Sequence, residues 1–368
     1  VEPVEQQSHW RRSRRGHAPG YHEQARQLTE ARREFEWLRA GAQMVQQQAL
    51  RDFAQAMTNF FAGAHRRPTW RKLGRHDGFR IVSVKPRHVR QLNRNRGAVW
   101  VPKVGWVQFR VSRPVPAAVS YRVTRDAAGR WHIAFAAVPD TIPAPGSGEV
   151  VGVDRGVQTS AALSSGDLLH CSGLRPTETE RLRRLQRRLA RAQRGSHRRH
   201  KTKAAIARLR AREADRRKDW VEKTSTDLAR RYDVIRVEDL NVGAMTRTAR
   251  GTVADPGRNV VQKTALNRGI LANGWGNLVA RLEHKAPGRV EKVPAAYTSQ
   301  TCSVCKTVDA EARESQAVFR CRSCGYTGHA DVNAARNIAA GRAVTARGDL
   351  DTSRSVKREP QPNRLLSA

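Results

Sequence analysis

The sequence predicts an α/β protein in which a helical and β-rich N-terminal lobe precedes a second domain of mixed strands and helices. The chain has 368 residues, enough for two or three domains. Helical patterns with one apolar face alternate with short segments rich in β-branched and aromatic residues. Residues 139–148 contain three prolines and two glycines, which cannot sustain a helix or a central strand, so the main domain boundary is expected there.

The N-terminal lobe is expected to span residues 22–148. Residues 1–21 are polar and arginine-rich, and we expect them to be a disordered basic N-terminus. Apolar residues at helical spacing then predict two helices between 22 and 62. These residues are Leu28, Phe35, Leu38, Leu50, Phe53, Met57, Phe60 and Phe61. Four strands are predicted next, with a hairpin turn at 126–129, and together they favour a small β-barrel. The strands are expected at 79–84, 106–111, 119–124 and 131–138.

The second domain is expected to span residues 149–341. Three short apolar segments at 149–154, 160–163 and 167–171 predict an antiparallel meander. Residues 178–230 then read as a helical hairpin with a break near Gly195. The remaining elements are a strand at 233–237, a loop at 247–257, an amphipathic helix at 259–285, a cysteine module at 302–324, a short helix at 332–341 and a disordered tail at 342–368.

The charge balance indicates a polyanionic partner. Lys and Arg total 69 against 33 Asp and Glu, which gives a net charge of +36 and a pI near 11.5, and nucleic acid is the first candidate for such a chain. The apolar runs are shorter than the roughly 20 residues that span a bilayer, and the N-terminus lacks an apolar signal core. We therefore exclude membrane insertion and secretion and expect a cytoplasmic protein.

More than a third of this excess charge lies on the predicted helical hairpin. Residues 181–218 contain 14 Arg and three Lys against two acids, a net charge of +15. A solvated helix face usually mixes both signs, and this one does not, so contact with nucleic-acid phosphates is favoured. The candidate contacts are Arg183, Arg187, Arg191, Arg198 and Lys201. Trp70 and Trp106 could stack on bases or belong to the barrel, and the sequence favours neither interpretation.

The cysteines have the spacing of a zinc ribbon. Cys302 and Cys305 form one C-x-x-C pair, and Cys321 and Cys324 form another after fifteen intervening residues. Two such knuckles complete a tetrahedral Zn²⁺ site, which is closed to water and therefore structural. A redox dithiol or an iron–sulfur cluster is the competing interpretation. Cys171 stands alone and is expected to be a small buried hydrophobic residue.

Three acidic residues stand at strand ends or at a helix start. Asp154 ends the apolar strand VVGVD, Glu238 ends the strand DVIRV in the same way, and Asp331 lies at the start of a helix seven residues after the last cysteine. For each acid taken singly, a helix N-cap or a solvated strand end is the competing interpretation. Brought together, they would bind Mg²⁺, and two such ions about 4 Å apart can activate water and stabilise the leaving oxygen in phosphodiester cleavage.

The order of these motifs carries a family resemblance. GVDRGV at 152–157, VEDLNV at 237–242, the cysteine module and DVNAARNIAA at 331–340 resemble the three split RuvC motifs and the zinc ribbon of TnpB (OrfB) proteins. These insertion-sequence proteins are similar to compact type V CRISPR effectors. The resemblance covers about residues 30–341, while residues 1–30 lack the Leu-Tyr-Pro-Thr-like first strand with which members of the family usually begin.

The resemblance implies an RNase H-like nuclease domain, with the zinc ribbon and the 178–230 hairpin as insertions. It implies that Asp154, Glu238 and Asp331 bind catalytic Mg²⁺ and cut target DNA under the direction of a guide RNA. Segment 79–138 would be the wedge-like barrel, and the helices at 22–62 would belong to the recognition lobe.

The leading interpretation is therefore an RNA-guided, Mg²⁺-dependent DNA endonuclease with a structural zinc. One alternative is a transposase that performs strand transfer at the same centre, although no separate site-specific DNA-binding domain is visible in the sequence. Another alternative is an N-terminally truncated copy that binds nucleic acid without cleaving it.

Overall fold

The computed structural model describes residues 20–69, 74 and 77–341. The predictions for residues 1–19, for Trp70 and for the 342–368 tail lie outside these ranges. Within them, the chain forms two compact units that divide between Val138 and Pro139, and the first unit also includes the tip of the hairpin, Leu185–Arg208. None of the described helices combines the length and the apolar composition needed to cross a bilayer.

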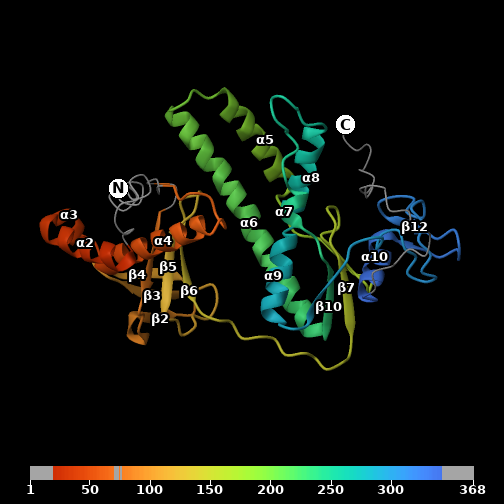
Figure 1. Cartoon of the computed structure of the whole chain (residues 1–368), viewed down its shortest axis with the longest axis horizontal. Coiled ribbons are helices and arrows are strands. Elements are labelled where there is room, and N and C mark those ends of the chain that lie inside the picture. Colours follow the sequence, from red (N-terminus) through yellow and green to blue (C-terminus); the bar gives the residue numbers. More distant parts are fainter. Residues whose placement is uncertain (1–19, 70–73, 75–76, 342–368) are drawn as a thin grey trace. The chain divides into compact units, whose positions relative to one another are not determined.

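Between residues 20 and 69, the structure has three helices rather than the two that were predicted (Figure 1). They are α2 (Tyr21–Glu34), α3 (Glu36–Ala40) and α4 (Gln43–Phe61). Phe35 interrupts the first predicted helix because its backbone is extended, with φ −102° and ψ 114°. The Arg32 guanidinium donates to the carbonyl oxygens of Leu38, at 2.5 Å, and Gly41, at 3.0 Å, and so fixes α3 against α2.

Six strands follow in two antiparallel sheets, in place of the single barrel that was expected. One sheet has the order β1 (Gly78–Val82), β5 (Ser120–Arg125), β6 (Trp131–Ala136), and the other has the order β2 (Val89–Asn93), β3 (Arg96–Val101), β4 (Gly105–Arg110). A 3₁₀ turn, Pro86–His88, precedes β2. The turn predicted at 126–129 is confirmed, since the Gly129 N–H donates to the Asp126 carbonyl at 2.9 Å.

The two sheets share one hydrophobic core. Ile81 and Tyr121 from the first sheet and Val99 and Val101 from the second are buried together, with side chains of α4 packed against them. The Tyr121 hydroxyl donates to the Trp100 carbonyl at 2.7 Å and ties β5 to β3. The sheets are therefore joined by packing and by side-chain hydrogen bonds.

The second unit is built on a five-stranded mixed sheet. Its order is β11 (Val290–Val293), β10 (Val234–Glu238), β7 (Val150–Asp154), β8 (Ala161–Leu163), β9 (Leu168–Leu169). The predicted meander is confirmed in β7, β8 and β9, which are antiparallel, whereas β10 pairs in parallel with both β7 and β11. β11 was not predicted, because the segment VEKV carries two charges in four residues.

Helices cover both faces of this sheet (Figure 1). On one face, Val151 and Val153 of β7 are buried against Leu228 of α6 (His197–Arg231) and Leu278 of α9 (Trp275–Lys285). On the other face, α10 (Ala330–Ala339) packs on β7, β8 and β10. Side chains alternate along a strand, so Gly152 faces α10 while its neighbours face α6 and α9.

The predicted helical hairpin is formed by α5 (Pro176–Arg191) and α6. The break lies where it was expected, at Gly195, whose φ of +82° favours glycine. The Arg216 guanidinium of α6 contacts the Glu178 carboxylate of α5 at 2.5 and 3.1 Å, which fastens the base of the hairpin.

The helix predicted at 259–285 is divided in two. α8 (Val260–Ala272) ends at Asn273, and α9 begins after Gly274, which has φ +67°. The buried Asn273 amide donates to the Val157 carbonyl at 2.9 Å, so the break gives a side-chain anchor to the loop after β7. A short helix, α7 (Val242–Met245), follows β10.

Candidate active site and metal centre

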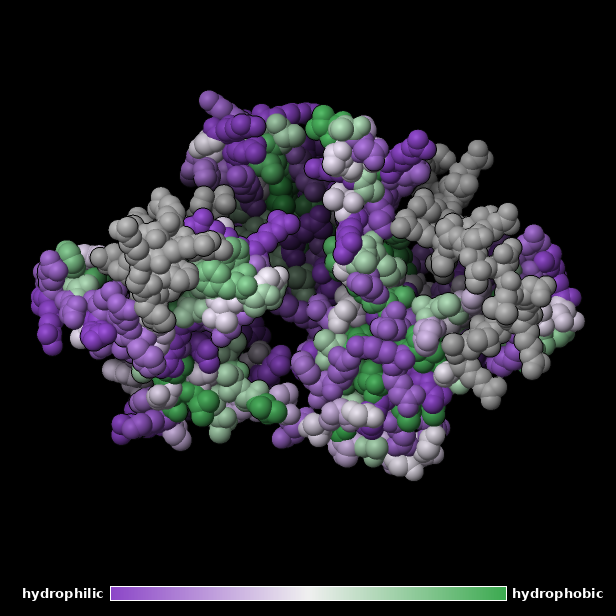
Figure 2. Space-filling view, in the orientation of Figure 1, coloured by the Kyte–Doolittle hydropathy of each residue, from purple (hydrophilic) through white to green (hydrophobic). Residues whose placement is uncertain are grey.

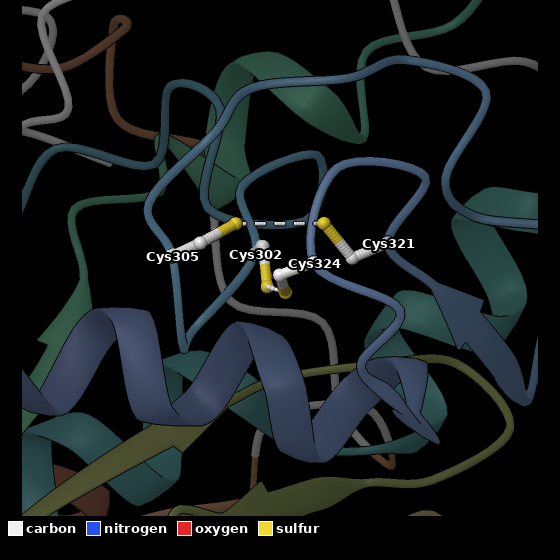
Figure 3. A group of neighbouring side chains, drawn as sticks. All are labelled: Cys302, Cys305, Cys321 and Cys324. Atoms are coloured by element: carbon white, nitrogen blue, oxygen red, sulfur yellow. Dashed lines mark hydrogen bonds between the residues drawn. The ribbon is translucent and has the colours of Figure 1, made fainter.

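The four cysteine sulfurs lie together in a small module with two further strands, β12 (Val318–Arg320) and β13 (Thr327–His329) (Figure 3). The two knuckles have the same backbone form. The Lys306 N–H donates to the Cys302 carbonyl, and the Gly325 N–H donates to the Cys321 carbonyl, each at 3.0 Å. Both donors have positive φ, 65° and 72°, which turns each loop back on its first cysteine.

The sulfur positions fit a tetrahedral zinc ion. Sγ of Cys302 is 3.7 Å from Sγ of Cys324, and Sγ of Cys305 is 3.5 Å from Sγ of Cys321. Four sulfurs at Zn–S bonds of about 2.3 Å would stand roughly 3.8 Å apart. Hydrogen bonds with the hydroxyl and the backbone N–H of Thr307 lower the pKa of Cys305 to about 6, whereas burial raises the pKa of Cys302, and the pKa of Cys324 is raised as well. The fit to a metal ion therefore rests on the positions of the four sulfurs.

Asp154 and Glu238 end neighbouring parallel strands on the same face of the sheet. Val153 of β7 pairs with Val237 of β10, and both valines are buried on the face covered by α6 and α9. Because side chains alternate, the next residue on each strand lies on the face covered by α10. Glu238 is the last residue of β10, as expected for a residue that ends this strand, and its side chain is buried.

Asp331 is the second residue of α10, and it is 5 % exposed. The N-cap is His329, whose Nδ1 accepts from the Asp331 N–H at 3.3 Å, so the interpretation of Asp331 as a cap is wrong. Its Oδ1 accepts a charged hydrogen bond from the guanidinium of Arg313, 2.9 Å away in the cysteine module. The third acid therefore meets a basic side chain from the cysteine module.

Buried hydrogen bonds join the cysteine module to α10. The Ser303 N–H, next to Cys302, donates to Oδ1 of Asn333 at 2.8 Å, and Nδ2 of Asn333 donates to the Thr301 carbonyl at 2.7 Å. Asn337, one turn later, donates to the same carbonyl at 2.7 Å. Since Asn333 lies two residues after Asp331, the first knuckle directly positions the helical turn that carries this acid.

Arg155 is a site residue that the sequence reasoning missed. Its guanidinium donates to the backbone carbonyl of Glu238 and so links the ends of β7 and β10. Burial lowers the pKa of Arg155, and the carboxylates of Glu238, Asp154 and Asp239 oppose that shift. The sequence did contain a signal for Arg155, because a basic residue directly after Asp154 lies next to an acidic strand end.

Across the described ranges, the four cysteines are the one group of three or more metal-ligating side chains gathered closely enough to hold an ion. Asp154 and Glu238 lie on one face of the sheet and Asp331 lies on the helix that covers this face, and the three acids do not form such a group. Arg313 draws Asp331 toward the cysteine module, and Arg155 lies at the ends of the two strands.

The predicted phosphate contacts on the hairpin are all exposed. Arg183, Arg187 and Arg191 lie on α5, and Arg198 and Lys201 lie on α6. Many side chains over the upper part of the hairpin are hydrophilic (Figure 2). Leu182 is buried and keeps the apolar side of α5 packed. Cys171 is only partly buried, in contrast to the prediction, because it lies at the edge of the unit beyond β9.

Comparison with known proteins identifies the family. The OrfB family of insertion sequence IS605, described as "Probable transposase", matches residues 132–249. A second family, described as "Cas12f1-like, TNB domain", matches residues 275–338, which contain the cysteine module and α10.

Two relatives span most of the chain. A protein of Escherichia coli K12 named "Putative RNA-guided DNA endonuclease InsQ" is 38% identical over 89% of this chain and 82% of its own length. A "Putative RNA-guided DNA endonuclease" of Streptomyces pristinaespiralis is 33% identical over 86% and 78%, respectively. Among solved structures, the cryo-EM structure of a Cas12f1–sgRNA–target DNA complex covers 80% of this chain and 70% of its own, with 14% identity and a TM-score of 0.49. On the sequence matches, the chain belongs to the OrfB (TnpB) family, whose relatives are named RNA-guided DNA endonucleases.

Proposed function

We propose that this chain is an RNA-guided DNA endonuclease that hydrolyses phosphodiester bonds with Mg²⁺ held by Asp154, Glu238 and Asp331. One observation supports the proposal above the others: two acids end neighbouring parallel strands on the face that is covered by the helix carrying the third. This arrangement is consistent with an RNase H-like domain over residues 149–341.

The chain's own residues would prepare the centre for this chemistry. Asp154 and Glu238 supply carboxylates from a rigid sheet, so their spacing does not depend on a loop. Arg155 limits the repulsion between them by placing a positive charge at the strand ends. Mg²⁺ bound by these carboxylates would supply an activated water and stabilise the charge on the leaving oxygen.

The remaining regions take supporting roles in this proposal. The zinc site is structural, because all four ligand positions are filled by cysteine and none is left for water. The hairpin arginines neutralise phosphates of the guide RNA or of its hybrid with target DNA, without reading sequence. Residues 22–148 form the recognition and wedge-like lobe.

The test compares Asp154→Ala, Glu238→Ala and Asp331→Ala with the parent, as ribonucleoproteins purified with their RNA. Each variant should lose Mg²⁺-dependent cleavage of matched DNA while binding nucleic acid nearly as before, because removing an acid does not weaken attraction to phosphate. Asp239→Asn, which alters the carboxylate next to Glu238, is the matched control and should retain most of the activity. A variant among the three that cut at the parental rate would remove that residue from the centre.

The family description as a transposase keeps strand transfer as a second candidate. The two activities differ in their products and in their need for RNA. Cleavage that requires the copurified RNA and leaves free DNA ends supports the endonuclease. Joining of ends to a second DNA molecule without RNA would favour strand transfer.

A further inference from the structure

Two tryptophans form an exposed pair on the outer face of the β2–β3–β4 sheet. Val99 and Val101 of β3 are buried in the shared core, so Trp100 between them lies on the opposite face. Trp106 of β4 is its direct cross-strand partner. The ring centroids are 5.7 Å apart with an interplanar angle of 70°, and the side chains are 40% and 37% exposed. Trp106 therefore belongs to a strand of the β-rich segment, as one interpretation held, but its ring lies outside the hydrophobic core.

Arginines surround this pair. The Arg90 guanidinium of β2 lies 3.9 Å from the centroid of the Trp106 ring, in stacking range. Arg96 of β3 and Arg110 of β4, both exposed, face each other directly across the same two strands. In the described part of the chain, no acidic side chain pairs with any of these three arginines. Like charges placed opposite each other destabilise a sheet, so folding alone does not account for this pair.

The surrounding sequence offers no compensating acid. Residues 78–125 contain nine Arg and two Lys and neither Asp nor Glu. This segment supplies five of the six strands in the first unit, and the acids that meet its arginines lie outside it. Arg122 pairs with Asp52 at 3.5 Å, and Arg125 pairs with Asp77 at 3.4 Å, both on the other sheet.

We propose that Arg90, Arg96, Trp100, Trp106 and Arg110, here called the tryptophan–arginine face, bind an unpaired stretch of the guide RNA. Exposed indole rings stack on bases that are not already stacked in a duplex, and the flanking guanidinium groups neutralise the phosphates on either side. Single-stranded RNA is the occupant because it offers unstacked bases to the two exposed rings and a continuous negative charge to a segment that has eleven basic and no acidic residues. The inference rests on the proposed function, because that function supplies the guide RNA. It concerns a surface of the first unit and not the acids of the second unit.

The first experiment measures binding of the full chain to a fluorescent single-stranded oligouridylate at several salt concentrations. Trp100→Leu with Trp106→Leu should weaken binding about tenfold or more, because the stacking of two bases is removed. The dependence of log K on log salt should keep its slope, since every phosphate contact remains. Trp37→Leu is the matched control, because Trp37 is 72% exposed on α3 and outside the face. Equal binding by the double variant and this control would overturn the proposal and leave a protein partner as the occupant.

A second pair of variants keeps the test independent of the tryptophans' contribution to folding. Arg96→Gln with Arg110→Gln should flatten the salt dependence by up to about 1.4 units, roughly 0.7 for each phosphate contact. The same change should raise the thermal midpoint slightly, because it removes a like-charge pair. An unchanged slope would show that these arginines do not touch phosphate and would overturn the proposal.

Ultraviolet crosslinking of the purified ribonucleoprotein with target DNA distinguishes the occupant. Peptides that contain Trp100 and Trp106 should carry ribonucleotide adducts. Deoxyribonucleotide adducts alone would overturn RNA as the occupant. Neither readout requires cleavage, so Asp154→Ala protein should behave like the parent in both experiments, and failure at the face is distinguishable from failure of the nuclease assignment.

Discussion

Gly152 of β7 lies so close to α10 that a Cβ atom added to it would come 2.0 Å from the carbonyl oxygen of Ala335. The same atom would lie 2.4 Å from the backbone nitrogen of Ala339. Both obstacles are backbone atoms of the helix, so they cannot move aside as a flexible side chain would. Glycine at this position therefore sets the distance between the strand that ends in Asp154 and the helix that carries Asp331.

Gly152→Ala should displace α10 and misplace Asp331. We expect a loss of about 3 kcal/mol or more in the free energy of unfolding, at the upper end of the range for overpacked cores, together with loss of cleavage. Gly276→Ala in α9 is the control, because a Cβ atom there meets nothing within 4 Å. Denaturant unfolding measures both variants. An alanine at 152 that leaves stability and cleavage unchanged would contradict the close packing.

One zinc ion should be bound per chain, and its loss should reduce cleavage as well as stability. Asn333 transmits the effect, because it hydrogen-bonds the first knuckle and lies two residues from Asp331. Cys305→Ser should lower the zinc content measured by metal analysis and slow cleavage. Cys171→Ser should change neither. Active protein with substoichiometric zinc would show that the module holds α10 without metal.

Changing Arg183, Arg187, Arg191, Arg198 and Lys201 to Gln should weaken binding of RNA or RNA–DNA hybrid roughly uniformly across sequences. Removing one phosphate contact should flatten the dependence of log K on log salt by somewhat less than one unit. Leu182 remains buried, so circular dichroism should show an intact hairpin. If parent and variant have equal slopes in binding titrations, these five side chains belong to a solvated face instead.

The hydrogen bonds of Glu178 at the base of the α5–α6 hairpin should stabilise the folded state less at acidic pH. Hydrogen bonds from Arg216 and from the Arg175 backbone lower the pKa of Glu178 from 4.5 to about 2. A carboxyl with a lowered pKa stabilises the folded state above its unfolded pKa, and this contribution disappears as the pH falls toward about 2. Between pH 4.5 and 2, the thermal midpoint of the parent should therefore fall more steeply than that of Glu178→Gln. Glu180→Gln, which alters an exposed pair with Arg184 at 3.9 Å, should follow the parent.

The sequence predicted those elements whose signal is local. The hairpin break at Gly195, the meander before it and the cysteine module all depend on residues close together in the chain, and all three are present. The elements that were missed have ambiguous local patterns. Residues 89–96, which form β2, its turn and the start of β3, contain three arginines and two asparagines. The amphipathic pattern of 259–285 continues through Asn273, although the helix is broken there and Asn273 makes a tertiary hydrogen bond.

The candidate site, too, was predictable from the sequence only where its signal is local. Strand endings identify Asp154 and Glu238 in the sequence, and their common face follows from a parallel register that the sequence does not contain. The contact between Arg313 and Asp331 joins residues on different elements, and nothing in the local pattern pairs them. Gly152 did carry a signal, since glycine within an apolar strand often marks a close backbone approach.

The closeness of β7 and α10 also has a consequence for the order of events during synthesis. Asp331 comes 177 residues after Asp154, so a growing chain completes β7, the hairpin and β10 long before α10 leaves the ribosome. The basic hairpin then exists on a nascent chain whose third acid has not yet been translated. Under the proposed function, RNA can therefore reach the hairpin on a chain that still lacks one of the three acids. The separation in sequence between β7 and α10 places the completion of the proposed centre after the synthesis of the basic hairpin.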